Sequence, residues 1–225
     1  MTSGIIVAAG KGTRMGPDVD KLFLEVAGRP LVAHTWQRLE DAGVLSEIIV
    51  VVREGLQGAF RDIARQFAFK LPYRLVAGGE QRQDSVWNGL EAVAPLTEIV
   101  VIQDGARPCT SGELIRATIK AAREDGAAVA AQRVTDTIKE SDGARLIART
   151  IDRSRLWSVQ TPQTFRVSVI RAALEAVRRQ GLQITDDTAA CELVGQPVVL
   201  VESGAPNPKA TSRSDLPYIE LLLRN

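Results

Sequence analysis

Short apolar runs alternate with segments of helical pattern along most of this chain of 225 residues. Apolar runs of this length, bounded by polar residues and glycine, are typical of strands buried on both faces. Alternation of such strands with helices predicts an α/β fold, with a mostly parallel twisted sheet flanked by helices. The predicted strands are 5–9, 48–52, 73–76, 99–102, 127–131, 157–160 and 198–201, and the predicted helices are 31–42, 60–67, 85–94, 114–122, 168–180, 188–193 and 215–223. We expect a single domain spanning 1–225.

Composition argues against several classes of protein. The net charge is +1, so the chain as a whole has no field that would attract nucleic acid or a membrane surface. No apolar run approaches 18 residues and the N-terminus leads directly into the first strand, so we expect neither a membrane span nor a signal peptide. Cys109 and Cys191 have no metal or disulfide spacing, which favours reduced thiols and a cytoplasmic location. His34 is the one histidine, which argues against a histidine triad or a multi-histidine metal site.

A glycine-rich loop follows the first strand. Glycines let backbone N–H groups turn inward, and a ring of inward N–H groups binds anions. The spacing does not match a P-loop, nor the dinucleotide fingerprint, because Met15 stands where the third glycine of that fingerprint belongs. The loop therefore suits a nucleotide polyphosphate bound in another way, although a plain glycine turn is the alternative for the loop taken alone. Its glycines and cations are Gly10, Gly12, Gly16, Arg14 and Lys21.

Two more polar clusters, 78–85 and 104–108, follow the third and fourth predicted strands. Ligands of open α/β sheets bind outside the carboxyl ends of the strands, so we expect the three clusters to converge at one edge of the sheet. Asp104 ends a strand, where it is either an Asx-turn residue or a carboxylate near Mg²⁺, which uses one or two carboxylates together with phosphates and water.

Segment 135–153 departs from the alternation. Thr137–Lys139 and Leu146–Thr150 flank the turn residues Ser141-Asp142-Gly143, which predicts a β-hairpin. An isolated hairpin is marginally stable, and this one has too few apolar residues to bury itself. It therefore needs a surface to lie on, either its own domain or a second copy of the chain.

Four motifs resemble, in order and spacing, those of the sugar-nucleotide pyrophosphorylase-like nucleotidyltransferases, and together they are most similar to the 2-C-methyl-D-erythritol 4-phosphate cytidylyltransferase family. They are A-A-G-K-G-T-R-M-G with D-K at 8–21, D-G-A-R-P at 104–108, L-W-S-V-Q-T-P-Q at 156–163 and N-P-K-A-T at 207–211. The resemblance implies a Rossmann-like sheet, CTP and a sugar-alcohol phosphate as substrates, Mg²⁺ or another divalent cation, and a homodimer clasped by the arm 135–153. Neither nucleic acid nor a membrane is an expected partner.

The resemblance also implies roles for individual residues. Gly79, Glu80 and Ser85 match the segment that recognises the base, and Thr137 and Arg153 match residues that reach the acceptor phosphate across the dimer. The implied catalytic residues are Arg14, Lys21, Arg153 and Lys209. The implied nucleotide-binding residues are Ala8, Ala9, Gly10, Gly12, Gly79, Glu80, Ser85 and Asp104. The implied acceptor-binding residues are Arg107, Thr137, Arg153, Thr161, Thr185 and Lys209, with Asp104 as the metal residue, directly or through water.

The implied reaction is cytidylyl transfer from CTP to 2-C-methyl-D-erythritol 4-phosphate. A phosphate monoester is mostly dianionic at pH 7, so it attacks without a general base, and catalysis consists of positioning and cationic stabilisation. The nearest alternative is a cytidylyltransferase for ribitol 5-phosphate on the same fold. Uridylyl- and guanylyltransferases are more distant alternatives, and a non-catalytic CTP-binding protein would not need Lys21, Arg153 or Lys209.

Overall fold

The centre of the molecule is a seven-stranded sheet with the order β11-β7-β10-β6-β1-β4-β5. The computed structural model describes residues 1–10, 20–143 and 145–224. The strands are β1 (Thr2–Ala8), β4 (Glu47–Val52), β5 (Tyr73–Ala77), β6 (Ile99–Asp104), β7 (Ala127–Arg133), β10 (Trp157–Arg166) and β11 (Val199–Glu202). All neighbouring strands are parallel except at β10, which is antiparallel to both β6 and β7. The predicted α/β fold with a mostly parallel sheet is confirmed.

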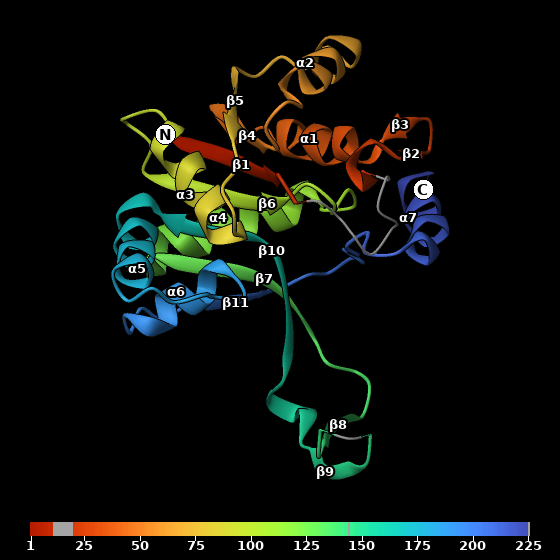
Figure 1. Cartoon of the computed structure of the whole chain (residues 1–225), viewed down its shortest axis with the longest axis vertical. Coiled ribbons are helices and arrows are strands. Elements are labelled where there is room, and N and C mark those ends of the chain that lie inside the picture. Colours follow the sequence, from red (N-terminus) through yellow and green to blue (C-terminus); the bar gives the residue numbers. More distant parts are fainter. Residues whose placement is uncertain (11–19, 144, 225) are drawn as a thin grey trace.

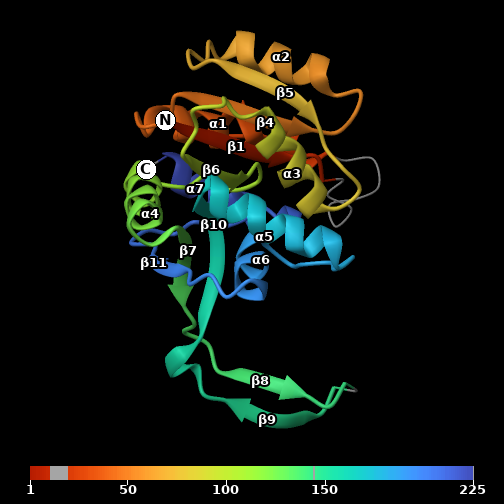
Figure 2. The same ribbon diagram turned by 90° about the vertical axis from the view of Figure 1, so that its left-hand side faces the viewer.

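Helices cover both faces of this sheet (Figures 1 and 2). Successive side chains of a strand point to opposite faces, and the continuous apolar runs therefore need cover on both sides. Ile6 and Val50 belong to the cluster on one face, and Ile5 and Ile49 belong to the cluster on the other. The first face packs against α1 (Leu31–Asp41), α2 (Gln57–Gln66), α4 (Gly112–Asp125) and α7 (Leu216–Arg224), and the second against α3 (Arg82–Ala92), α5 (Val167–Arg179) and α6 (Asp187–Leu193).

Two predicted elements have different bounds in the structure. Helix α3 was expected to begin at Ser85, but it begins at Arg82, because the Asp84 carboxylate accepts a hydrogen bond of 3.0 Å from the Gln81 backbone N–H and caps an earlier turn. Strand β10 was expected to cover only 157–160, but it continues to Arg166. Pro162 interrupts the sequence pattern there, and the structure accommodates it by a shift in the β7 register between Val159 and Gln163.

The segment 135–153 forms a hairpin that projects from the body of the molecule (Figures 1 and 2). Its strands, β8 (Ile138–Ser141) and β9 (Ile147–Ile151), pair in antiparallel orientation. The side chains of Leu146 and Ile147 near its tip are 70% and 65% exposed. The predicted hairpin is confirmed, and it does not lie folded against the helices of its own chain.

The order of the strands also defines a crevice. From β1 the chain adds β4 and β5 on one side of β1, and then crosses to add β6 on the other side. The carboxyl ends of β1 and β6 therefore lie where the direction of strand addition reverses, and such a switch point is where open α/β sheets bind ligands. The shorter elements are η2 (Lys21–Phe23), β2 (Glu25–Val26), β3 (Arg29–Pro30), η3 (Arg153–Arg155) and η4 (Arg213–Asp215). None of the described helices is long and apolar enough to cross a membrane.

Candidate active site

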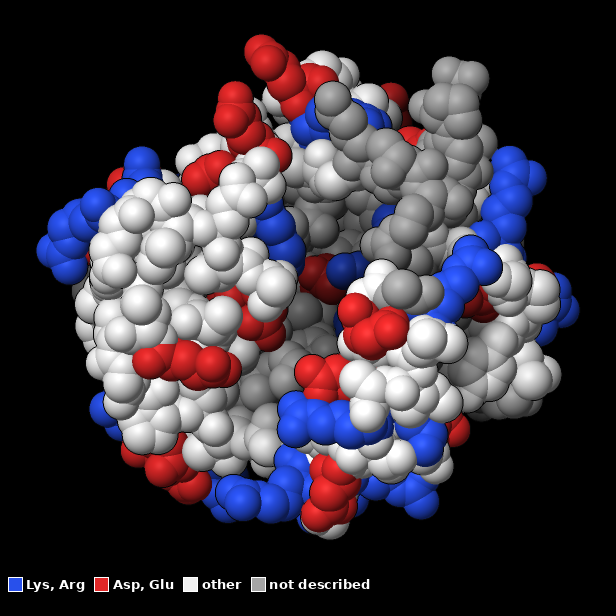
Figure 3. Space-filling view, turned by 60° about the horizontal axis from the view of Figure 1, so that its bottom comes forward, with Lys and Arg blue, Asp and Glu red and all other residues white. Residues whose placement is uncertain are grey.

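A pocket of about 630 Å³ lies at this switch point. Residues of all three polar clusters line it, the first cluster through Gly10 and Lys21 at the described ends of its loop. Acidic and basic side chains both surround the hollow on this face (Figure 3). Of the predicted site residues, those that line the pocket are Ala8, Ala9, Gly10, Lys21, Gly79, Glu80, Ser85, Asp104 and Lys209. Gly12 and Arg14 lie outside the described residues.

The turn between β5 and α3 forms one wall of the pocket. The Ser85 hydroxyl accepts a hydrogen bond of 3.1 Å from the Gly79 N–H and donates one of 3.2 Å to the Gln81 carbonyl, so it fixes the turn from inside. Close packing leaves no room for a side chain at Gly78 or Gly79. A Cβ atom on Gly78 would lie 2.3 Å from the Ala9 Cβ, and one on Gly79 would lie 2.3 Å from the Asp84 Cβ. The turn is thus packed directly against Ala9, the residue that follows β1.

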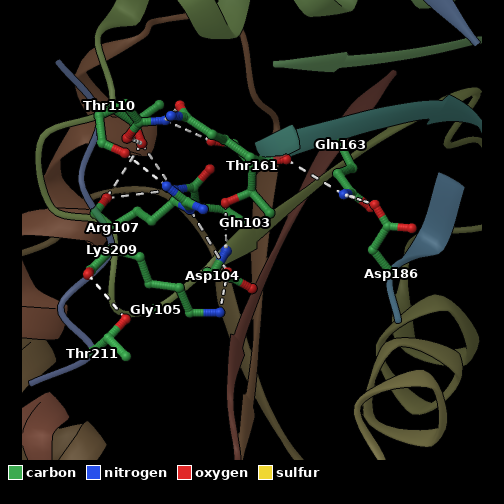
Figure 4. Close-up of polar contacts among 12 residues, drawn as sticks. Gln103, Asp104, Gly105, Arg107, Thr110, Thr161, Gln163, Asp186, Lys209 and Thr211 are labelled. Atoms are coloured by element: carbon green, nitrogen blue, oxygen red, sulfur yellow. Dashed lines mark hydrogen bonds and ion pairs between the residues drawn. The ribbon is translucent and has the colours of Figure 1, made fainter. Parts of the chain in front are cut away.

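Asp104 is the charged centre of the site (Figure 4). Its Oδ2 lies 2.7 Å from the Lys209 Nζ and 3.8 Å from the Arg107 Nε, and its Oδ1 lies 3.5 Å from the Arg82 Nε. Burial acts to raise the pKa of this carboxyl, but the three cations outweigh it, so the pKa is lowered and Asp104 is ionised at neutral pH. Because Lys209 comes from the chain's C-terminal part, folding brings together residues that are far apart in sequence.

Arg107 and Thr161 lie behind Asp104 rather than at the surface of the pocket. The Arg107 Nη1 donates a hydrogen bond of 2.7 Å to the Asn207 carbonyl, and burial lowers the pKa of its guanidinium. The Thr161 hydroxyl accepts a hydrogen bond of 3.1 Å from the Asp104 N–H, and Thr161 is 2% exposed. In this structure both residues hold the backbone around Asp104, and Arg107 also ties this backbone to the segment that carries Lys209.

Lys21 lines the pocket and is the first residue of η2. Its Nζ donates a hydrogen bond of 2.8 Å to the Ala210 carbonyl, next to Lys209. The Asp20 carboxylate accepts a hydrogen bond of 3.1 Å from the Leu22 N–H and also pairs with Arg53. The lysine thus begins a short helical turn that is anchored on the pocket wall.

The remaining predicted residues do not line the pocket. Thr137 and Arg153 lie at the base of the hairpin, where the Arg153 guanidinium donates to the Thr135 carbonyl. Thr185 is exposed ahead of α6, and it is Asp186 that caps this helix, by accepting a hydrogen bond of 3.0 Å from the Ala189 N–H. A single chain therefore builds the pocket around Asp104 without these three predicted acceptor-binding residues.

Three charged residues of the pocket wall, Arg53, Glu54 and Arg82, were not assigned a role from the sequence. Arg53 directly follows a strand, so the rule that indicated Asp104 also applied to it. Arg82 lies within the predicted cluster 78–85, and its Nη1 is 2.9 Å from the Oδ2 of Asp187, which is fully buried. No local pattern links Arg82 to Asp187, because they are 105 residues apart.

Similarity to known proteins extends over the whole chain. A family model described as IspD, 2-C-methyl-D-erythritol 4-phosphate cytidylyltransferase, matches residues 3–225. A protein of that name from Geobacillus kaustophilus is 42% identical over 219 residues, which are 97% of this chain and 95% of the relative.

Two solved structures have the same fold. The 4-diphosphocytidyl-2C-methyl-D-erythritol synthase of Anaerococcus prevotii superposes with a TM-score of 0.87 at 30% identity, covering 100% of this chain and 98% of that one. The 2-C-methyl-D-erythritol 4-phosphate cytidylyltransferase of Thermus thermophilus superposes with a TM-score of 0.83 at 32% identity, and both chains are covered completely. The chain belongs to the 2-C-methyl-D-erythritol 4-phosphate cytidylyltransferase family.

Proposed function

We propose that the pocket at the switch point is where this enzyme carries out the reaction of its family, the transfer of a cytidylyl group from CTP to 2-C-methyl-D-erythritol 4-phosphate in the non-mevalonate route to isoprenoid precursors. The observation that carries the assignment is Asp104, which stands at the carboxyl end of β6 with Lys209 on one oxygen and two guanidiniums nearby. The Gly78–Gly79 turn holds the cytosine, and Ala8 to Gly10 lie against the nucleotide.

Charge is the obstacle that the site has to overcome. An oxygen of the acceptor's phosphate forms a bond to the α-phosphorus of CTP, the bond from that phosphorus to the bridging oxygen breaks, and pyrophosphate leaves. The acceptor's second pKa is about 6, so its dianion needs no general base at pH 7. Lys21, whose Nζ donates a hydrogen bond to the Ala210 carbonyl, neutralises the charge that develops at the α-phosphate, and we assign the same role to Arg14. Lys209 and Arg153 hold the incoming acceptor phosphate in line.

Asp104 has the chemistry of a partial magnesium site. Mg²⁺ uses one or two carboxylates and completes its shell with phosphate oxygens and water. Among residues 1–10, 20–143 and 145–224 no cluster of carboxylates, histidines and cysteines is able to hold a metal by itself. Asp104 is the residue that would hold such a cation, together with phosphate oxygens of the bound nucleotide and water. When bound there, the cation would polarise phosphoryl oxygens and help to orient the triphosphate.

The acceptor side of the site requires the hairpin of a second copy. Arg153 and Thr137 lie at the base of an arm that extends away from its own body, and the tip exposes Leu146 and Ile147. In the proposed homodimer the arm brings Arg153 and Thr137 to the acceptor phosphate in the partner's pocket, while Thr185 lies at the acceptor side. We place the dimer in the cytoplasm without nucleic acid or membrane partners, in keeping with free cysteines and a net charge of +1.

The test is pyrophosphate release with CTP, Mg²⁺ and either 2-C-methyl-D-erythritol 4-phosphate or ribitol 5-phosphate, repeated with UTP, ATP and GTP. We expect release with CTP and the methylerythritol phosphate only. Release with ribitol 5-phosphate instead would show that the enzyme transfers the cytidylyl group to a different acceptor by the same mechanism. No release with any pair of substrates would contradict the proposal.

Variants then test the roles of the cations. We expect Lys21→Ala and Lys209→Ala to lower kcat about 100- to 1000-fold, the usual cost of removing one preorganised charge donor. Arg153→Ala should mainly raise KM for the acceptor. A rise in KM for CTP in Arg153→Ala, with the acceptor unaffected, would show that the roles are wrongly assigned.

A further inference from the structure

Arg82 bridges two carboxylates that lie on different parts of the fold. Its Nε is 3.5 Å from the Asp104 Oδ1 at the pocket, and its Nη1 is 2.9 Å from the Asp187 Oδ2 inside the protein. Asp104 ends β6, Arg82 begins α3 and Asp187 begins α6. The Arg82 guanidinium therefore links the end of β6 at the pocket with the start of α6, the helix that follows Thr185.

Asp187 is fully buried, unlike the carboxylate of an ordinary surface ion pair. The residue is 0% exposed, its Oδ1 has no hydrogen-bond partner among the described residues, and burial raises the pKa of its carboxyl. Burying a charge is costly, and a buried ion pair is often no more stabilising than apolar residues of the same volume. Fold stability alone is therefore a weak reason for a carboxylate at this position.

Side chains around Asp187 hold it in place. Its N–H donates a hydrogen bond of 3.0 Å to the Gln163 Oε1, and the Gln163 Nε2 donates one of 2.9 Å to the Asp186 Oδ2 (Figure 4). Gln163 follows Thr161 by two residues on β10, and Thr161 in turn accepts from the Asp104 N–H. The start of α6 is thus fastened to the same strand that supports the backbone of Asp104.

We propose that Asp187 is a positioning residue for the transfer reaction, which holds the Arg82 guanidinium at the pocket wall so that Arg82 fixes Oδ1 of Asp104 while Lys209 fixes Oδ2. Asp187 itself does not line the pocket, and it acts only through Arg82. This inference rests on the proposed role of Asp104 at the triphosphate. It adds a buried residue and a pocket arginine to the machinery that orients this carboxylate.

The experiment compares Asp187→Asn, Arg82→Gln and the double variant in the full-length enzyme with CTP, Mg²⁺ and 2-C-methyl-D-erythritol 4-phosphate. Asparagine keeps the shape of the side chain and removes its charge. We expect Asp187→Asn to lower kcat about 10- to 100-fold, as is usual when a group that orients a functional ligand is lost, with the KM for CTP changed less than about threefold. The double variant should be no slower than the slower single variant, because the two residues act as one unit.

A matched control separates positioning from stability. Glu47 is a buried carboxylate whose Oε2 lies 3.0 Å from the Arg74 Nη2, at the amino end of β4 and so at the opposite edge of the sheet from the pocket. Glu47→Gln should lower the melting temperature but leave kcat and KM within twofold of wild type. If Asp187→Asn behaves in the same way, Asp187 is only structural and the proposal is wrong.

Two further results keep the test decisive. If Asp187→Asn does not fold, Arg82→Lys replaces it: an ammonium group is unable to bridge the two carboxylates as the planar guanidinium does, so kcat should fall, and wild-type kcat would overturn the proposal. Asp104→Asn tests the underlying assignment separately. Full activity of Asp104→Asn would contradict the proposed function, whereas an inactive Asp104→Asn beside a normal Asp187→Asn would contradict this inference alone.

Discussion

Gly78→Ala tests whether close contact between β1 and the turn after β5 shapes the nucleotide pocket. The added Cβ would lie 2.3 Å from the Ala9 Cβ and 3.0 Å from the Ser85 Oγ. Carbon atoms in contact are normally about 3.5 to 4.0 Å apart, so the turn or β1 has to move by about 1.5 Å. A misplacement of 1 Å in a site is able to cost about 100-fold in rate, and we therefore expect kcat/KM for CTP to fall by about that factor.

The assay is steady-state pyrophosphate release at 25 °C, together with thermal unfolding followed by circular dichroism. Overpacking costs about 1 to 3 kcal/mol, so the melting temperature of Gly78→Ala should fall by about 2 to 12 °C while the protein remains folded at the assay temperature. Gly58→Ala is the matched control, because Gly58 lies in α2 and no atom lies within 4 Å of the added Cβ. It should retain wild-type kcat/KM and gain up to about 1 kcal/mol in stability. A Gly78→Ala enzyme with wild-type kcat/KM for CTP would refute the reasoning.

Three other predictions address charge, thiols and assembly. Burial acts to raise the pKa of Asp104, but the surrounding cations lower it below the ordinary carboxyl value of about 3.9. The ionised carboxylate therefore stabilises the fold above about pH 3.9, and this stabilisation is lost as the pH falls through the pKa of Asp104 in the folded protein. In urea unfolding, Asp104→Asn should therefore be less stable than wild type at pH 7, and the difference should shrink below about pH 4; a constant difference would contradict the ion-pair explanation. Burial raises the pKa of Cys109 to about 11 and that of Cys191 to about 12. At pH 8 both thiols of the native protein should thus react with Ellman's reagent at least about 90-fold more slowly than in the unfolded chain, because the thiolate is the reactive form, and rapid labelling of the native protein would disprove it. For the proposed dimer, the double variant Leu146→Asp with Ile147→Asp should move the mass in light scattering from dimer to monomer, and an unchanged dimer would show that the tip of the arm is not required for assembly.

The sequence by itself determined the fold class and the edge of the sheet that carries the site. Continuous apolar runs such as 48–52 have to be covered on both faces, and their alternation with helical segments predicted a mostly parallel sheet between helices. Local chemistry also fixed helix ends, since α1 ends at Asp41 and Gly43 adopts a φ of +69°. Polar residues directly after strands located the pocket, because parallel strands end at a common edge.

Only the tertiary structure decided which charges meet there. Lys209 pairs with Asp104, Lys21 reaches the Ala210 carbonyl 189 residues away, and Asp187 holds Arg82 from inside the fold. Periodicity and turn chemistry act over a few residues, whereas these contacts depend on the order in which strands join the sheet. The antiparallel insertion of β10 between β6 and β7 has the same origin, because strand order is set by the packing of the whole sheet and not by the composition of any one strand.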